Sequence, residues 1–99
     1  MALTYRIKAR AKREIEKAAE WWSENRLAAP GAVRKDVEDA LKILVDHPGI
    51  GTKVETGRSL QVRRFLLNRI SHYMYYRVRR AELEVLSVWH TSREHGPRV

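Results

Sequence analysis

Arginine and histidine side chains in the second half of this 99-residue sequence are the groups best suited to chemistry. Cleavage of RNA by attack of a 2′-hydroxyl on the adjacent phosphate needs a general base, a proton donor and cations beside the developing charge. His72, His90 and Glu84 could provide the acid and the base, since histidine titrates near neutral pH. A histidine at the end of a strand is more often structural than catalytic, so a binding surface without catalysis is the alternative. The arginines that could hold phosphate are Arg63, Arg64, Arg69, Arg77 and Arg93.

Positive charge is concentrated in the same half of the sequence. Residues 1–51 contain ten Lys and Arg against eight Asp and Glu, whereas residues 52–99 contain ten against four, and the whole chain has a formal net charge of +8. This asymmetry favours an acidic or nucleic-acid partner for the second half. Charge alone specifies no ligand, and a solvated basic face is the alternative.

Composition excludes several other classes of protein. The sequence contains no cysteine, which removes disulfides, zinc-thiolate sites and thiol catalysis. The four histidines lack the i, i+4 spacing of a helical zinc pair, and we expect neither a metal nor a cofactor. No apolar run approaches the ~20 residues of a membrane span, and the polar, basic residues 1–10 do not resemble a secretory signal. We therefore expect a cytoplasmic protein with one domain over residues 1–99 and no membrane contact.

Two amphipathic helices are predicted in the first half. Apolar residues recur at helical spacing from Ala11 to Trp22, which predicts a helix ending near Asn25. A short connection with Pro30 leads to a second helix, which ends at residues 47–49 (His-Pro-Gly) because proline cannot continue the backbone ladder. The apolar face of this second helix consists of Val33, Val37, Ala40, Leu41 and Leu44. Each helix has one apolar stripe, so both need a sheet on which to pack.

The sheet is predicted from one early segment and three late ones. Leu3, Tyr5 and Ile7 alternate with polar residues, as in a short strand with one buried face. Three further segments are rich in β-branched and aromatic residues and predict an antiparallel meander: Val62–Leu67, Ser71–Val78 and Leu83–His90. The chain reverses at Asn68-Arg69 and in a hairpin turn over Arg79–Glu82, and Thr52–Gln61 is predicted to be a polar loop.

The predicted fold class is α+β, with an N-terminal strand, an αα-hairpin and a three-stranded antiparallel meander in the order β-αα-βββ. The N-terminal strand could join the meander as an edge or an inner strand. Strict alternation places Tyr73, Tyr75 and Arg77 on one face of the middle strand. In the last strand it separates Leu83, Val85, Ser87 and Trp89 from Glu84, Leu86, Val88 and His90. One face should take the helices, and the other could be a partly apolar groove for a partner.

Aromatic residues could belong to the core or contact a partner. Trp22 shares the apolar stripe of the first helix and is expected in the core, whereas Trp21 lies off that stripe. Trp21 therefore either covers the helix hairpin or faces outward as an anchor for a partner. Tyr73, Tyr75 and Tyr76 lie among arginines and could stack on bases, although aromatic residues in strands are more often core, and Trp89 belongs with them.

In this order and at this length, the features resemble the RelE/ParE superfamily of bacterial toxins, and its ParE branch in particular. The resemblance covers nearly the whole chain. It rests on the β-αα-βββ order and on the segments His47–Gly49, Val62–Phe65, Tyr73–Val78 and Val85–His90, the last followed by Arg93-Glu94. Each motif is weak alone, and the combination without cysteine is fairly specific.

The resemblance implies the toxic component of a type II toxin–antitoxin system, of the plasmid-stabilisation type, bound to a cognate ParD-like antitoxin in a hetero-oligomer. ParE-like toxins poison DNA gyrase, whereas RelE-like relatives cut mRNA on the ribosome. The tail after His90 lacks the tyrosine that several RNA-cutting relatives carry, and Thr52–Gln61 has only Lys53 and Arg58 as basic residues. These departures favour gyrase inhibition by protein–protein contact. An mRNA endonuclease and a small basic nucleic-acid-binding protein are left as alternatives.

The site residues follow from these interpretations. For a toxin that acts by binding, we expect no catalytic residue. Contacts to the target or to phosphate are expected from Arg63, Arg64, Arg69, Arg77, His90 and Arg93. Contacts to the antitoxin are expected from Trp21, Tyr73, Tyr75 and Trp89. If the protein is a ribonuclease, Arg64, His90 and Arg93 are the expected catalytic residues.

Overall fold

The computed structural model describes residues 2–55, 61–92 and 96–97. Its elements follow the order β1 (Thr4–Ile7), α1 (Ala9–Asn25), α2 (Ala32–Asp46), the 3-10 turn η1 (Pro48–Ile50), β2 (Thr52–Val54), β3 (Val62–Leu67), β4 (His72–Arg79) and β5 (Glu82–His90). The predicted α+β class is confirmed, and so are both helices and the three late strands. No helix in the described ranges is long and apolar enough to cross a membrane.

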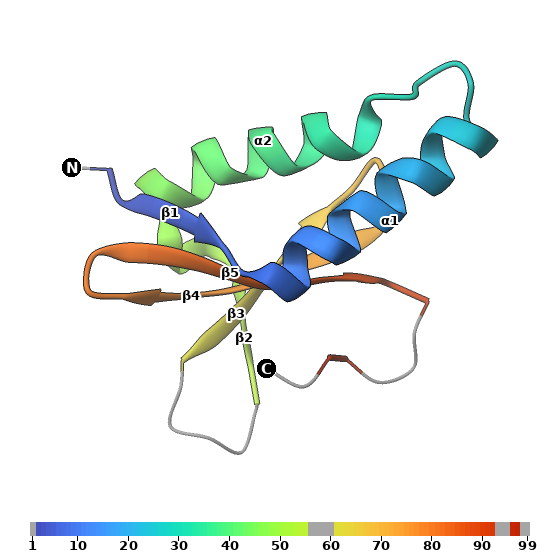
Figure 1. The fold of residues 1–99 in the computed structure, drawn as a ribbon. Coiled ribbons are helices and arrows are strands. Elements are labelled where there is room, and N and C mark those ends of the chain that lie inside the picture. Colours follow the sequence, from blue (N-terminus) through green and yellow to red (C-terminus); the bar gives the residue numbers. More distant parts are fainter. Residues whose placement is uncertain (1, 56–60, 93–95, 98–99) are drawn as a thin grey trace.

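All five strands form one sheet in the order β1-β5-β4-β3-β2. Strands β3, β4 and β5 pair antiparallel as the predicted meander, and β1 lies at the edge, parallel to β5. The helices α1 and α2 lie on the same side of this sheet (Figure 1). The sheet face opposite to the helices is called the open face below.

Strand β2 was not predicted. Thr52–Gln61 was expected to be a polar loop, but Thr52, Lys53 and Val54 pair antiparallel with β3 as the other edge of the sheet. A three-residue strand with one apolar residue carries too little alternation to be detected locally. Its conformation depends on the hydrogen bonds that β3 offers.

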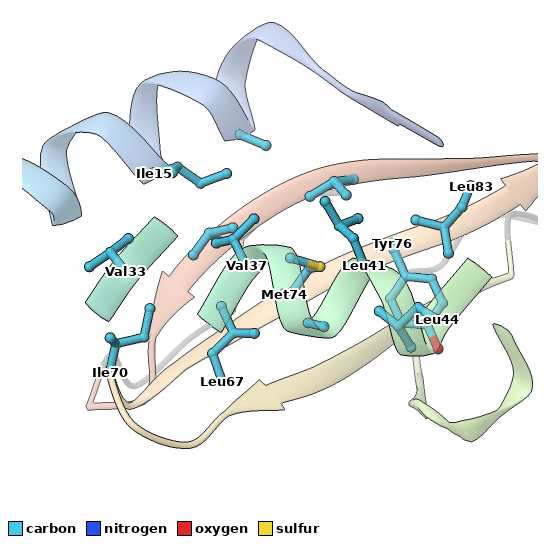
Figure 2. Packing of buried hydrophobic residues seen from close by; sticks show 14 of the residues in the cluster. Ile15, Val33, Val37, Leu41, Leu44, Leu67, Ile70, Met74, Tyr76 and Leu83 are labelled. Atoms are coloured by element: carbon cyan, nitrogen blue, oxygen red, sulfur yellow. The ribbon is translucent and has the colours of Figure 1, made fainter. Parts of the chain in front are cut away.

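The core lies between the helix hairpin and the sheet (Figure 2). All five residues predicted for the apolar face of α2 are buried, and Trp22 packs against the core as expected. The sheet contributes Leu67, Met74, Tyr76, Leu83, Val85 and Val88, the β3–β4 turn contributes Ile70, and α1 contributes Ala11 and Ile15. Because these apolar side chains meet across two layers, each helix buries the single stripe that its sequence predicted.

The alternation predicted for the last strand is wrong beyond Val85. Tyr76 pairs with Val85 but Tyr75 pairs with Ser87, so Leu86 is an extra residue in β5. Such a β-bulge reverses the facing of every later side chain. Leu83 and Val85 therefore share the core with Val88, which strict alternation placed on the opposite face. A bulge arises from cross-strand pairing, and no local sequence pattern predicts it here.

The edge of β5 beyond the bulge is closed by a side chain. The ladder between β1 and β5 ends at Ile7 and Val85, with a last bond from the Lys8 amide to the Val85 carbonyl. Further along, the Glu14 carboxylate of α1 accepts hydrogen bonds from the Ser87 hydroxyl (2.8 Å) and from the Val88 amide (3.1 Å). Helix α1 thus satisfies backbone and side-chain donors at an edge that β1 is too short to reach.

Tyr5 was predicted to lie on the buried face of its strand, but 54% of it is exposed. Leu3 and Ile7 do pack against the core, and the Leu3 amide donates to the Val45 carbonyl at the end of α2. Strand β1 is a four-residue edge strand. Its central side chain therefore lies at the rim of the layer, where it lines a shallow pocket with residues of α2 that include Leu41.

The predicted hairpin turn between the last two strands is confirmed as a two-residue loop. Arg79 pairs with Glu82, and the two residues between them, Arg80 and Ala81, have φ angles of 52° and 60°. Positive φ at both central positions is the pattern of a type I′ turn, whose twist matches that of the flanking strands. Neither position holds asparagine or glycine, the residue types that adopt positive φ most readily.

Candidate functional sites

The open face carries an aromatic pair and an arginine. Met74 and Tyr76 of β4 belong to the core beneath the helices, so the alternate residues Tyr73 and Tyr75 point to the open face. Their rings are 6.3 Å apart in an edge-to-face arrangement. The guanidinium carbon of Arg64 in β3 lies 4.1 Å from the centroid of the Tyr73 ring. This cation–π contact holds a positive charge against an aromatic surface, which is an arrangement suited to partner or phosphate contact.

Trp89 joins this aromatic surface, because it pairs with Tyr73 across β4 and β5 and directly opposite residues share a face. The guanidinium carbon of Arg10, in the first turn of α1, lies 5.7 Å from the centroid of its ring. Tyr75, in contrast, is only 3% exposed. Gly96 lies against it, since a Cβ atom built on that glycine would come within 3.1 Å of the Tyr75 hydroxyl oxygen. Gly96 therefore lies over part of the open face.

A second arrangement joins the sheet to the turn after α2. The Tyr76 hydroxyl accepts a hydrogen bond from the Gly51 amide (3.0 Å) and donates one to the Pro48 carbonyl (2.7 Å). Arg63 donates to the Gly51 carbonyl (2.7 Å). Burial raises the pKa of Tyr76, although the Gly51 hydrogen bond and the charge of Arg63 oppose the shift. The phenol is therefore held protonated, as its bond to Pro48 requires, and Arg63 contributes to the fold.

A nearly buried ion pair lies across β4 and β5. Nε of Arg77 is 2.7 Å from Oε1 of Glu84, and Nζ of Lys8 is 3.5 Å from Oε2 of the same carboxylate. The hydrogen bond from Arg77 lowers the pKa of Glu84 and outweighs the opposing effect of burial, while nearby positive charges lower it further. Glu84 is thus an ionised carboxylate near neutral pH. The acid or base role considered for Glu84 has no geometric support, because its oxygens already face two cations.

A concave site lies where the C-terminal end of α1 meets the ends of β4 and β5. It has a volume of about 500 Å³ and is called the end pocket below. Its lining residues are Ala18, Trp21, Trp22, Arg26, Arg69, Ile70, Ser71, His72 and His90. The rings of His72 and His90, which are opposite residues in β4 and β5, meet edge to face with centroids 5.0 Å apart.

The hydrogen bonds of the two histidines assign different proton positions to them. Nδ1 of His72 lies 2.7 Å from the Ile70 carbonyl oxygen, which can only accept, so this nitrogen carries a proton. Nδ1 of His90 accepts a hydrogen bond from the Ser92 amide at 3.0 Å, so it carries none in the neutral ring. Both Nδ1 atoms are therefore engaged within the protein, and these hydrogen bonds fix the orientation of the two rings in the wall of the end pocket.

The structure divides the residues singled out from the sequence between two regions. His72 alternates with Tyr73, so His72 and its partner His90 lie on the helix side of the sheet, whereas Arg64 lies on the open face against Tyr73. Trp21 belongs to the end pocket with Arg69, which also lies 3.7 Å from a carboxylate oxygen of Asp36. Arg93, and its neighbour Glu94 in the sequence, fall outside the described residues.

The end pocket as a site was not predicted. Trp22 and Arg26 were not among the expected site residues, and the lining residues come from three separate stretches of the sequence. Their only common sequence signal was the pair of tryptophans before an arginine at the end of a helix. In the described part of the chain, no group of three or more His, Asp or Glu side chains could hold a metal ion.

The chain is similar to a solved structure described as the chromosomal ParDE TA system from P. aeruginosa, with a TM-score of 0.74 over 92% of this chain and 98% of that chain. The identity is 17%, so this likeness shows the fold alone. No curated protein matches the chain.

The family is shown by a separate comparison. The family model of the ParE toxin of the type II toxin–antitoxin system parDE matches residues 5–95. The chain belongs to the ParE toxin family, and it is a toxin of the type II toxin–antitoxin class. The resemblance to the ParE branch that was inferred from the sequence is confirmed.

Proposed function

We propose that this toxin inhibits DNA gyrase in the cytoplasm by protein–protein contact, without a catalytic residue. The observation that carries the proposal is the separation of Arg64 and His90. These are the two described members of the set expected for an RNA-cutting enzyme, and they lie on opposite faces of the sheet. A phosphate held by Arg64 would not be in reach of His90 for proton transfer, which requires hydrogen-bond distance.

The open face is the proposed gyrase-binding surface. Of the arginines expected to contact the target, Arg77 is engaged by Glu84 and Arg63 by Gly51. Arg64 lies against the ring of Tyr73 on the open face. Arginine beside aromatic residues is the combination that concentrates binding energy in protein interfaces. We therefore assign the main target contact to Arg64.

A cognate ParD-like antitoxin is the second proposed partner. The expected contact residues lie on two surfaces, with Tyr73 and Trp89 on the open face and Trp21 in the end pocket. A single antitoxin segment that reaches both must pass around the edge formed by α1 and β5. Gly96 lies against Tyr75, so direct contact of the antitoxin with Tyr75 would require Gly96 to move. The high positive charge favours an acidic segment.

Growth and enzyme assays test the target. Induction of the chain without its antitoxin should arrest growth with a DNA-damage response and intact mRNA, and the purified toxin should inhibit supercoiling by purified gyrase. The Arg64→Ala variant should lose inhibition, whereas Arg34→Ala, which removes an exposed arginine from the opposite helix layer, should retain it. Cleaved mRNA in the wild type, lost in Arg64→Ala and His90→Ala, would overturn gyrase inhibition in favour of ribonuclease action.

Binding of the antitoxin is tested separately. The antitoxin gene is expected to be a short reading frame next to the toxin gene that encodes an acidic C-terminal segment. Titration of that protein should restore gyrase activity, and Trp21→Ala and Trp89→Ala should each weaken the complex. If both variants bind the antitoxin as tightly as the wild type, the route around α1 and β5 is wrong.

A further inference from the structure

We infer that the end pocket is a binding site for a nucleotide, either free or at the exposed end of a nucleic-acid strand. The common chemistry of these two ligands is a phosphate next to a flat aromatic base. The site is distinct from the proposed gyrase-binding surface, because the histidines that line it lie on the helix side of the sheet. Three properties of the pocket support a ligand of this kind.

The first property is its charge. Four of the lining residues are Arg26, Arg69, His72 and His90, and none of the described lining residues is acidic. Arg69 shares its charge with Asp36, at the loose distance of 3.7 Å. Arg26 makes no ion pair within the described residues, and its guanidinium donates to the Asn25 carbonyl. Two guanidinium groups around one concavity favour an anion, and guanidinium geometry matches phosphate oxygens.

The second property is the aromatic wall. Trp21 is 50% exposed, although tryptophan is highly buried on average in folded proteins. Its ring meets that of Trp22 edge to face at 6.0 Å, and the guanidinium carbon of Arg26 lies 5.2 Å from its centroid. The guanidinium lies over the ring of Trp21, and exposed indole rings are groups on which bases stack. This wall lies next to the cations that would hold the phosphate.

The third property is an unused donor. The indole Nε1 of Trp22 is buried and makes no hydrogen bond to any described residue. A buried donor without an acceptor is costly and uncommon in folded proteins. Trp22 lines the pocket but its Nε1 atom is covered, so an oxygen or ring nitrogen of a bound nucleotide would accept from it only after the indole turned toward the ligand. A purely apolar ligand would leave this group unsatisfied.

The dimensions of the pocket suit a compact ligand. Helix α1 bounds it on one side, and the β3–β4 turn with the ends of β4 and β5 bounds it on the other. Its volume of about 500 Å³ falls within the range of small-molecule sites.

The test measures the binding of adenosine 5′-monophosphate to the purified toxin. Calorimetry gives the affinity, and the indole N–H signals in ¹⁵N-correlated NMR spectra show which tryptophans are near the ligand. We expect saturable binding that moves the signals of Trp21 and Trp22 and leaves that of Trp89 largely in place. Each of Arg26→Ala and Arg69→Ala should weaken binding about tenfold, which corresponds to the loss of one charge-assisted hydrogen bond. Arg13→Ala removes the same charge from an exposed position of α1 and should leave affinity unchanged.

Further arms identify the source of the ligand and the outcomes that overturn the inference. The ligand is a strand end if a short single strand with a 5′-phosphate binds more tightly than the mononucleotide and is weakened by the same substitutions. The ligand is a free nucleotide if the mononucleotide binds more tightly than the strand. Inorganic phosphate binding as tightly as either would refute base recognition. If Arg13→Ala and Arg26→Ala lose the same amount of nucleotide affinity, the binding depends on the net charge of the protein and not on the pocket. If an acidic peptide shifts the Trp21 and Trp22 signals and the nucleotide does not, the pocket is a protein-docking site and the inference is wrong.

Discussion

Arg77 and Glu84 face each other across β4 and β5 with Nε and Oε1 2.7 Å apart, and the Glu84 side chain is only 6% exposed. The two residues are directly opposite in the strand register, next to the type I′ turn. Lys8, which follows β1, approaches the same carboxylate. One buried anion therefore connects three neighbouring strands at the end of the sheet that is remote from the end pocket.

Arg77→Ala should destabilise the protein by about 3 kcal/mol, because removal of one partner leaves a buried charge with weakened compensation. Chemical denaturation measures the loss. Arg79→Ala, an exposed arginine of the same strand, should change stability by less than about 0.5 kcal/mol. The double variant Arg77→Leu/Glu84→Leu should recover part of the loss, and a double variant less stable than Arg77→Ala would contradict the account.

The same pair predicts a dependence on pH. The folded state lowers the pKa of Glu84 through the hydrogen bond from Arg77. The folded protein thus binds this proton less readily than the unfolded chain, so the stabilisation is present above the ordinary glutamate pKa of about 4.3 and is lost as the pH falls below it. Glu84→Gln should lower the free energy of unfolding at neutral pH and flatten its acid dependence. If the free energy of unfolding falls with acid in parallel for the wild type and Glu84→Gln, another carboxylate is responsible for the acid dependence.

Tyr76→Phe should cost about 1 to 3 kcal/mol of stability, since it removes one oxygen and leaves the Gly51 amide and the Pro48 carbonyl without their buried partner. Thermal unfolding is a sufficient measurement. Trp21 and Trp22 signals should be unchanged, because this position lies in the core away from the end pocket. A variant as stable as the wild type would mean that water replaces the hydroxyl.

Gly51→Ala should be strongly destabilising. A Cβ atom at this position would lie 2.8 Å from a ring carbon of Tyr76 and 2.9 Å from the Arg64 carbonyl oxygen, and neither atom can move away freely. Gly49→Ala is the matched control two residues earlier, where an added Cβ atom has no neighbour within 4 Å. Equal stability of the two variants would disprove the close packing at Gly51.

Arg80→Asn combined with Ala81→Gly should stabilise the toxin by about 1 kcal/mol, because both positions have positive φ and Asn-Gly is the favoured pair in type I′ turns. The melting temperature should rise accordingly. Inhibition of gyrase should be unaffected, since the turn lies beyond the proposed contact at Arg64. A lower melting temperature would mean that the native side chains make stabilising contacts that outweigh the strained backbone.

The helices, the meander and the family could be predicted from the sequence because each depends on local periodicity or on motif order. The apolar face of α2 is one example, since Val37, Leu41 and Leu44 are separated by helical spacing that any apolar layer would bury. The hairpin turn at Arg80 is another, since its position follows from the two strands that flank it.

Only the tertiary structure decided which residues meet. Leu86 is extruded by the pairing of β5 with β4, and this bulge puts Val88 in the core. The same sheet places Arg64 and His90 on opposite faces and brings His90 beside Trp22 and Arg26, which are more than sixty residues away in the sequence. Strand pairing and layer packing are non-local interactions, so the chemistry suggested by arginine and histidine content was assigned to particular surfaces only by the folded chain.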